Sequence, residues 1–138
     1  RTNVRAPYAL TQALLPMLKS SKGQVVFINS LAGLSAHAGQ AQYAASKHAL
    51  KAVADSLREE VKTAGVRVLS VFLGKVATPM QEYVHEVEGR TYAPSRLAQP
   101  EDVASIVAHC LELPRTVEVT DITVVPFIGP MNPSPETI

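Results

Sequence analysis

Cysteine is nearly absent from this sequence, which limits the sulfur chemistry open to the protein. Cys110 is the only cysteine among the 138 residues. A disulfide within the chain and a metal site built from several thiolates are therefore both excluded. A single thiol suits the reducing cytoplasm, where we expect the protein to reside.

Long apolar runs and a strong excess of one charge are also missing. No apolar stretch approaches the roughly 20 residues that a membrane-spanning helix needs, and the first residues lack the apolar core of a signal peptide. Lysine and arginine number 13 against 12 acidic residues, a formal net charge of +1. We therefore expect neither a membrane nor a nucleic acid as partner.

Hydrophobic residues make up 46% of the chain and charged residues 18%, which is typical of a soluble globular protein and argues against disorder. The spacing of the apolar residues alternates between helical and strand-like patterns. It predicts helices over 6–20, about 42–64 and 99–113, and strands over 24–29, 66–73 and 119–127. Pro16 should bend or shorten the first helix. Residues 78–99 read as a partly helical excursion, of the length that often forms a lid.

The alternation of strands and helices predicts an α/β fold. Right-handed crossovers would place the strands parallel in one sheet, with helices on both faces. The nearly all-apolar runs "QVVFIN" and "VRVLSVFL" fit strands that are buried on both faces. Three strands make a thin sheet with one unpaired edge beside a buried face. The pattern therefore indicates half of a doubly wound domain.

Ligands bind outside the carboxyl ends of the strands in an open α/β sheet, and candidate residues fall there. Ser30 follows the first strand, Gly74 follows the second, and Tyr43 and Lys47 lie at the start of the helix after the first strand. Side chains four residues apart share one helical face. The phenol and the ammonium group are therefore expected to lie close together.

A phenol beside an ammonium group can exchange protons with a substrate. Free tyrosine has a pKa of about 10, and a neighbouring positive charge lowers the pKa of a phenol. The phenol could then protonate a carbonyl oxygen or take a proton from an alcohol, while a serine hydroxyl holds the same oxygen. No side chain supplies a hydride, so this chemistry implies a nicotinamide cofactor.

The same two residues could also belong to an ordinary solvated helix surface. A tyrosine four residues before a lysine arises by chance in roughly one chain in five of this length. Ser30, thirteen residues before Tyr43 and directly after a strand, makes a much rarer joint arrangement. That arrangement favours a catalytic site.

The segment "VVFINSLAGLSAHAGQAQYAASKHALKAVADSLREEV" resembles the active-site region of the short-chain dehydrogenase/reductase family. That family carries a serine thirteen residues before the tyrosine of a Tyr-x-x-x-Lys motif. The segments "NVRAPYALTQALLPML", "VFLGKVATPM" and "QPEDVASIV" resemble the regions on either side of that motif. The resemblance covers nearly the whole chain and implies a Rossmann-like fold.

The resemblance implies a catalytic set of four residues. Tyr43 would donate or accept the proton, and Lys47 would favour its ionised form and hydrogen-bond the nicotinamide ribose. Ser30 would orient the substrate oxygen. Asn3 would hold a water molecule in a proton relay.

The resemblance also implies contacts to the cofactor and to the substrate. Gly74, Val76 and Thr78 would contact the nicotinamide, beside Tyr43 and Lys47. Because His37 and Gln40 lie between Ser30 and Tyr43, they could line the substrate pocket with Ser30, or could equally be exposed loop residues. Met80 and Tyr83, at the start of the expected lid, could also contact the substrate.

Two features depart from the family pattern. Leu73 stands where the family usually has a proline. The family's opening strand, glycine-rich turn and helix, which bind the pyrophosphate, have no counterpart in the sequence. We therefore expect residues 1–138 to form a single partial domain that holds the last three of the family's seven strands, without the N-terminal nucleotide-binding half. The choice between NAD and NADP normally depends on that missing half.

Two functions follow as hypotheses. The first is an NAD(P)-dependent oxidoreductase that interconverts a small-molecule carbonyl and alcohol. The helices over 2–20 and 42–64 resemble the pair that forms the family's dimer interface, so a homodimer or homotetramer is expected. The second hypothesis is a non-catalytic truncated remnant or assembly module.

One acidic segment could be mistaken for a metal site. The stretch "HEVE" at 85–88 is interpreted as a solvated acidic segment and not as metal ligands.

Overall fold

The computed structural model describes residues 2–128, in which helices and strands alternate as predicted. The helices are α1 (Arg5–Ser21), α2 (Ala41–Val61), α3 (Pro79–Val87) and α4 (Pro100–Glu112), and the strands are β1 (Gln24–Ser30), β2 (Arg67–Leu73) and β3 (Asp121–Val124). Short 3-10 turns lie at Leu31–Gly33, Lys62–Ala64 and Pro94–Arg96. Within residues 2–128, no helix is both long and apolar enough to cross a membrane.

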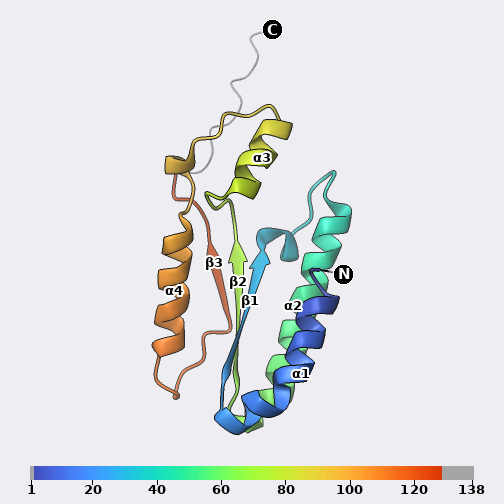
Figure 1. Cartoon of the computed structure of the whole chain (residues 1–138), viewed down its shortest axis with the longest axis vertical. Helices are drawn as coiled ribbons and strands as arrows, with labels where there is room; N and C mark the ends of the chain where they lie inside the picture. The colour runs from blue at the N-terminus through green and yellow to red at the C-terminus, as the bar shows by residue number, and fades with distance from the viewer. Residues whose placement is uncertain (1, 129–138) are drawn as a thin grey trace.

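The three strands form one parallel sheet in the order β1-β2-β3. Ser30 pairs with Leu73, and Leu73 pairs with Val124, so the three strands end at the same level. Figure 1 shows α4 on one side of the sheet, α1 and α2 on the other, and α3 beyond the carboxyl ends of the strands. The predicted α/β fold with a parallel sheet is confirmed, and both crossovers, through α2 and through α4, return the chain to the amino ends of the strands.

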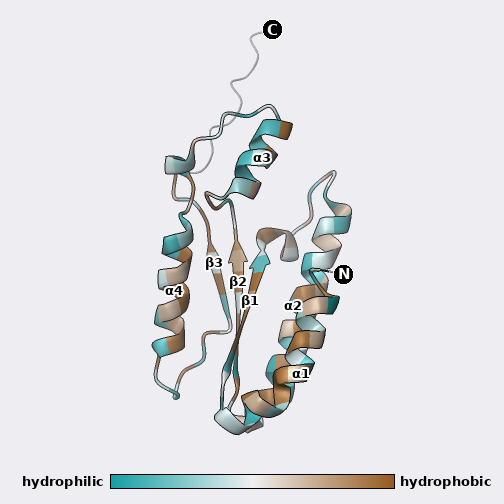
Figure 2. Cartoon of the chain, viewed as in Figure 1, coloured by the Kyte–Doolittle hydropathy of each residue, from teal (hydrophilic) through white to brown (hydrophobic). Residues whose placement is uncertain are grey.

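Each face of the sheet has its own hydrophobic core, because successive strand residues point to opposite faces. Phe27 and Val68 pack on the α2 side, and Leu69 and Val71 pack on the α4 side. The first core includes the α2 residues Leu50, Ala54, Leu57 and Val61, and the second includes the α4 residues Val103, Val107 and Cys110. Hydrophobic residues accordingly line the strands in Figure 2.

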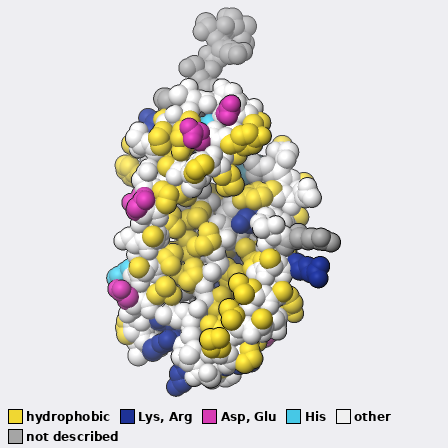
Figure 3. All heavy atoms as spheres, viewed as in Figure 1, with side chains coloured by type: hydrophobic (Ala, Val, Ile, Leu, Met, Phe, Trp, Pro, Cys, Tyr) yellow, Lys and Arg dark blue, Asp and Glu magenta, His cyan; other side chains and the backbone are white. Residues whose placement is uncertain are grey.

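The outer edge of β1 is unpaired within the part of the chain that the structure describes. Ile28, on this strand, is 50% exposed although it lies in a run of apolar residues. Apolar side chains also gather over the middle of the face seen in Figure 3. The thin sheet with one open edge agrees with the expectation from the sequence.

The structure corrects several element boundaries. α1 begins at Arg5 after a turn at residues 2–4, and it continues past Pro16 to Ser21, so the proline does not shorten it. The first residues after β1, Leu31–Gly33, form a 3-10 turn. β3 is shorter than the predicted 119–127. It ends at Val124 because its partner β2 ends at Leu73, the residue that pairs with Val124.

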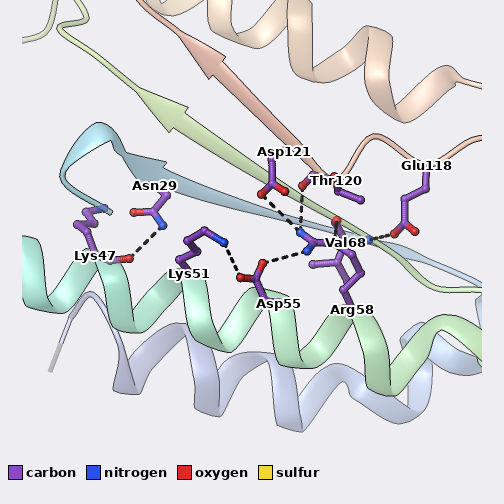
Figure 4. Close-up of polar contacts among 9 residues, drawn as sticks. All are labelled: Asn29, Lys47, Lys51, Asp55, Arg58, Val68, Glu118, Thr120 and Asp121. Carbon is purple, nitrogen blue, oxygen red and sulfur yellow. Dashed lines mark hydrogen bonds and ion pairs between the residues drawn. The ribbon is translucent and has the colours of Figure 1, made fainter. Parts of the chain in front are cut away.

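Arg58 ties α2 to the sheet. Its side chain is 11% exposed. Nε donates to the carbonyl oxygen of Val68 at 3.0 Å, one Nη donates to Asp55 at 3.0 Å, and the other donates to the carbonyl oxygen of Thr120 at 3.0 Å. Figure 4 shows this guanidinium group between the helix and the strands. One side chain therefore joins α2, β2 and the start of β3.

Asp55 completes this cluster. Its carboxylate accepts from Lys51 at 2.6 Å as well as from Arg58. Burial raises the pKa of Asp55, but the hydrogen bonds from Lys51 and Arg58 outweigh burial and lower that pKa below its ordinary value. The carboxylate is therefore held in its charged form by the two cations.

Candidate active site

The candidate site lies at the carboxyl ends of the strands, where the parallel sheet brings three chain segments together. β1 ends at Ser30, β2 ends at Leu73, and α2 begins at Ala41. Tyr43 and Lys47 lie in the first two turns of α2. The fold therefore gathers the predicted catalytic residues at one end of the sheet.

Tyr43 and Lys47 share one face of α2, as their spacing predicts. The Lys47 Nζ lies 5.9 Å from the centroid of the Tyr43 ring. The Tyr43 side chain is 43% exposed, so its phenol is accessible to a molecule from solvent.

Ser30 is held by its own loop. Its backbone is extended, with φ −135° and ψ 157°, and its Oγ accepts from the backbone N–H of Ala32 at 3.2 Å. That contact caps the 3-10 turn Leu31–Gly33. A hydroxyl that accepts one hydrogen bond still has its proton to donate, so Ser30 can donate to a substrate oxygen.

Asn29 lies directly behind these residues and was not in the predicted catalytic set. It is 3% exposed. Its Oδ1 accepts from the backbone N–H of Ser30 at 2.8 Å, and its Nδ2 donates to the carbonyl oxygen of Lys47 at 3.1 Å. Figure 4 shows the second of these contacts. The signal in the sequence is an amide at the end of the otherwise apolar run "VVFIN".

Asn3 reaches the same helix by a different route. Its Nδ2 donates to Ser46 Oγ at 3.1 Å, and that hydroxyl donates to the carbonyl oxygen of Tyr43 at 2.7 Å. The structure therefore places Asn3 beside the turn that carries Tyr43 and Lys47. The predicted water-holding role of Asn3 stays a prediction.

The segment predicted to contact the nicotinamide is anchored on both sides. The backbone N–H of Gly74 donates to the carbonyl oxygen of Val124 at 2.8 Å, and Val76 forms a parallel bridge with Ala98. The Thr78 hydroxyl accepts from the backbone N–H of Gln81 at 3.2 Å and caps α3. Gly74, Val76 and Thr78 therefore form a well-held stretch beside the end of β2, and their contact with a cofactor stays a prediction.

Of the residues predicted to line the substrate pocket, Ser30 is half-buried, whereas His37, Gln40 and Met80 are exposed. His37 and Gln40 lie in the turn before α2, where the Gln40 N–H donates to the carbonyl oxygen of His37 at 3.1 Å. Met80 and Tyr83 on α3 are 71% and 64% exposed. The turn before α2 and the helix α3, which carry these residues, lie at the same end of the molecule as the end of β1 (Figure 1).

His85 corrects the interpretation of "HEVE" as a solvated segment. The imidazole is only 2% exposed, and it lies edge-on to Tyr92 with ring centroids 5.5 Å apart. Its Nδ1 lies 2.8 Å from the carbonyl oxygen of Gln81, to which it donates. His85 thus pins α3 to the segment that follows, while the acidic neighbours stay exposed. Among residues 2–128, no group of three or more histidine, cysteine or acidic side chains could hold a metal ion.

Comparison with known proteins identifies the family. The family model described as short chain dehydrogenase matches residues 1–89, which contain Ser30, Tyr43 and Lys47. The chain belongs to this family. The Rossmann-like fold of this short-chain dehydrogenase agrees with that membership.

Individual relatives support the same family assignment. An uncharacterized oxidoreductase of Staphylococcus epidermidis is 31% identical over 125 residues, which cover 90% of the chain and 52% of that protein. A tropinone reductase homolog of Arabidopsis thaliana is 33% identical over 129 residues, which cover 89% and 48%. A metagenomic short-chain oxidoreductase, solved in complex with NADP, superposes with a TM-score of 0.67 at 28% identity and covers 88% and 47%. The chain spans about half the length of these relatives.

Proposed function

We propose that this short-chain dehydrogenase catalyses NAD(P)-dependent interconversion of a carbonyl and an alcohol in a small molecule, with Tyr43 as general acid and base. The observation that carries the proposal is the Lys47 ammonium group 5.9 Å from the ring of an exposed Tyr43. Ser30 supports it, because the amide of Asn29 contacts both Ser30 and the backbone of Lys47.

Each side chain has a part in moving one proton. In the direction of reduction, the Tyr43 phenol gives its proton to the carbonyl oxygen of the substrate as that oxygen gains negative charge. Lys47 stabilises the phenolate that remains. The Ser30 hydroxyl donates a hydrogen bond to the same substrate oxygen and so lowers the barrier. Oxidation of the alcohol uses these groups in the reverse order.

The residues at the strand ends fit one part of a nicotinamide dinucleotide. Lys47 and the Tyr43 hydroxyl would bind the ribose of the nicotinamide half, next to the anchored stretch Gly74–Thr78. The cofactor supplies the hydride when bound. The sequence has no glycine-rich turn for the pyrophosphate. We propose that residues 1–138 form the catalytic part of a domain whose phosphate-binding part lies in other residues of the protein.

Turnover with reduced nicotinamide tests the proposed function. The protein, as expressed from its natural gene, is mixed with NADH or NADPH and a panel of small ketones and aldehydes. We expect the absorbance of reduced nicotinamide to fall with at least one pair, and the protein to enhance nicotinamide fluorescence on binding. No oxidation with any pair, together with no fluorescence change, would contradict the proposal.

A groove on α2, away from Tyr43 and Lys47, supports a role in assembly. A groove of about 280 Å³ runs between α1 and α2, lined by Tyr8, Thr11, Gln12, Ala52, Val53, Ser56, Leu57 and Glu60. α1 also exposes Leu10 and Met17, at 62% and 64%. We propose that this surface packs against a second copy of the chain, in a homodimer or homotetramer, because apolar surface of this kind marks interfaces.

Sedimentation of the natural protein tests the assembly role. We expect a mass of two or four copies, and a shift toward one copy in Ala52→Glu, which places a charge in the groove. Ala104→Glu, the same change at an exposed position of α4, is the matched control and should leave the mass unchanged. A single-copy mass for the unaltered protein would refute the assembly role.

A further inference from the structure

We infer that Asn29 is a positioning residue that sets the placement of Lys47, and with it Tyr43, relative to Ser30. The inference rests on the proposed function, because it concerns the geometry of the same site. Asn29 touches neither substrate nor cofactor in this role. It acts through the backbone of the two segments that carry the catalytic groups.

The contacts of Asn29 join the two halves of the candidate site. Its Oδ1 accepts from the Ser30 N–H at 2.8 Å, and its Nδ2 donates to the Lys47 carbonyl oxygen at 3.1 Å, eighteen residues along the chain from Asn29. A planar amide holds its oxygen and nitrogen at a fixed separation. The end of β1 and the second turn of α2 are therefore held at one distance.

Gly33 makes room for this amide. A Cβ at position 33 would lie 2.9 Å from Asn29 Oδ1, 3.0 Å from Asn29 Nδ2 and 3.0 Å from the Lys47 carbonyl oxygen. Gly33 is buried in the 3-10 turn that Ser30 caps. Any side chain there would push the amide away from Lys47 or push α2 away from the sheet. The hydrogen bond between Asn29 and the Lys47 carbonyl therefore depends on the residue type at two positions, 29 and 33.

The amide is not needed to complete the secondary structure. Within α2 the Lys47 carbonyl already accepts from the backbone four residues on, and Asn29 uses its second lone pair. The four residues of β1 before Asn29 are apolar, and an apolar residue at this buried position would avoid the cost of burying an amide. What the polar residue adds is a defined position of α2 relative to Ser30, and the reaction depends on that position.

Asn29→Asp in the natural protein tests the contact with the Lys47 carbonyl, because it replaces the amide donor by an oxygen of a carboxyl group. The substitution keeps the shape of the side chain and the oxygen that accepts from Ser30, but it places an oxygen against the Lys47 carbonyl. We expect kcat to fall about 10- to 100-fold, as misplacement of a catalytic group by about 1 Å can cost. KM should change by less than about threefold. Ser70→Ala is the matched control, because Ser70 is fully buried in β2 and its hydroxyl has no partner.

A double-variant comparison separates positioning from simple stability. In a Lys47→Ala background we expect Asn29→Asp to lower kcat by a smaller factor than in the unaltered protein, because the side chain that it positions is gone. Equal factors in both backgrounds would show that Asn29 does not act through Lys47. Gly33→Ala serves as a second variant and should reproduce the loss in kcat.

Three further outcomes would overturn the inference. These are an unaltered kcat in Asn29→Asp, an unaltered kcat in Gly33→Ala, and failure of both variants to fold where Ser70→Ala folds. The last would make the amide a requirement of the fold and not of the site. Tyr43→Phe keeps the two proposals apart. If that variant is inactive while Asn29→Asp retains full turnover, only the role of Asn29 is wrong.

Discussion

Tyr43→Phe lowers kcat of the natural protein by roughly 10²- to 10⁴-fold, the range that a positioned general acid or base contributes. The substitution removes one hydroxyl and leaves the ring that lies beside Lys47. Tyr43 is 43% exposed, so its loss opens no cavity in either core. The thermal unfolding temperature should therefore stay within about 2 °C of the unaltered protein.

Ser105→Ala is the control for this prediction. Ser105 lies on α4 and is exposed, so the variant also removes one hydroxyl group from a helix surface, at a position outside the candidate site and the groove. We expect its kcat to equal that of the unaltered protein. Turnover near normal in Tyr43→Phe would remove Tyr43 from the mechanism and with it the proposed function.

Arg58→Ala lowers the free energy of unfolding by about 3 kcal/mol, which is typical when one partner of a buried charged network is removed. The loss is large because three acceptors depend on one guanidinium group. These are the carbonyl oxygens of Val68 and Thr120 and the carboxylate of Asp55. Urea unfolding of the natural protein measures the difference.

Arg90→Ala provides the comparison for Arg58. Arg90 forms an ion pair with Glu88 at 3.4 Å, but the two side chains are 40% and 39% exposed. Exposed pairs of this kind contribute little, so we expect a change within about 0.5 kcal/mol. If Arg58→Ala and Arg90→Ala lowered the free energy of unfolding equally, the buried contacts of Arg58 would add no stability beyond that of an exposed ion pair.

The loss of unfolding free energy caused by Arg58→Ala should also depend on pH. The folded-state pKa of Asp55 is lowered by Lys51 and Arg58 against the opposing effect of burial. A lowered pKa stabilises the fold above the unfolded-state value, and that stabilisation is lost as the pH falls through the folded-state value. The difference between the unaltered protein and Arg58→Ala should therefore narrow below a pH of about 4, the ordinary aspartate range. If the difference in unfolding free energy between the two proteins stayed constant down to the pH of acid unfolding, the ion pair with Asp55 would not contribute to the effect of Arg58.

The parts of this fold that depend on local pattern could be predicted. The apolar runs identified β1 and β2 within a residue or so, and the helical stripe of α2 placed Tyr43 and Lys47 on one face. Helix and strand periods are properties of neighbouring residues, so they need no knowledge of the rest of the chain. Boundaries that depend on a partner strand, such as the ends of β3, were less accurate.

Residue type and spacing by themselves excluded a disulfide within the chain, predicted a parallel α/β sheet and grouped Ser30, Tyr43 and Lys47, and the family resemblance added Asn3. Only the tertiary structure showed that Asn29 contacts Lys47, that Arg58 reaches Thr120 sixty-two residues away, and that His85 is buried. The physical reason is the same in each case. A hydrogen bond between distant segments depends on how helices pack on the sheet, and that packing is decided by the whole core and not by the few residues around each side chain.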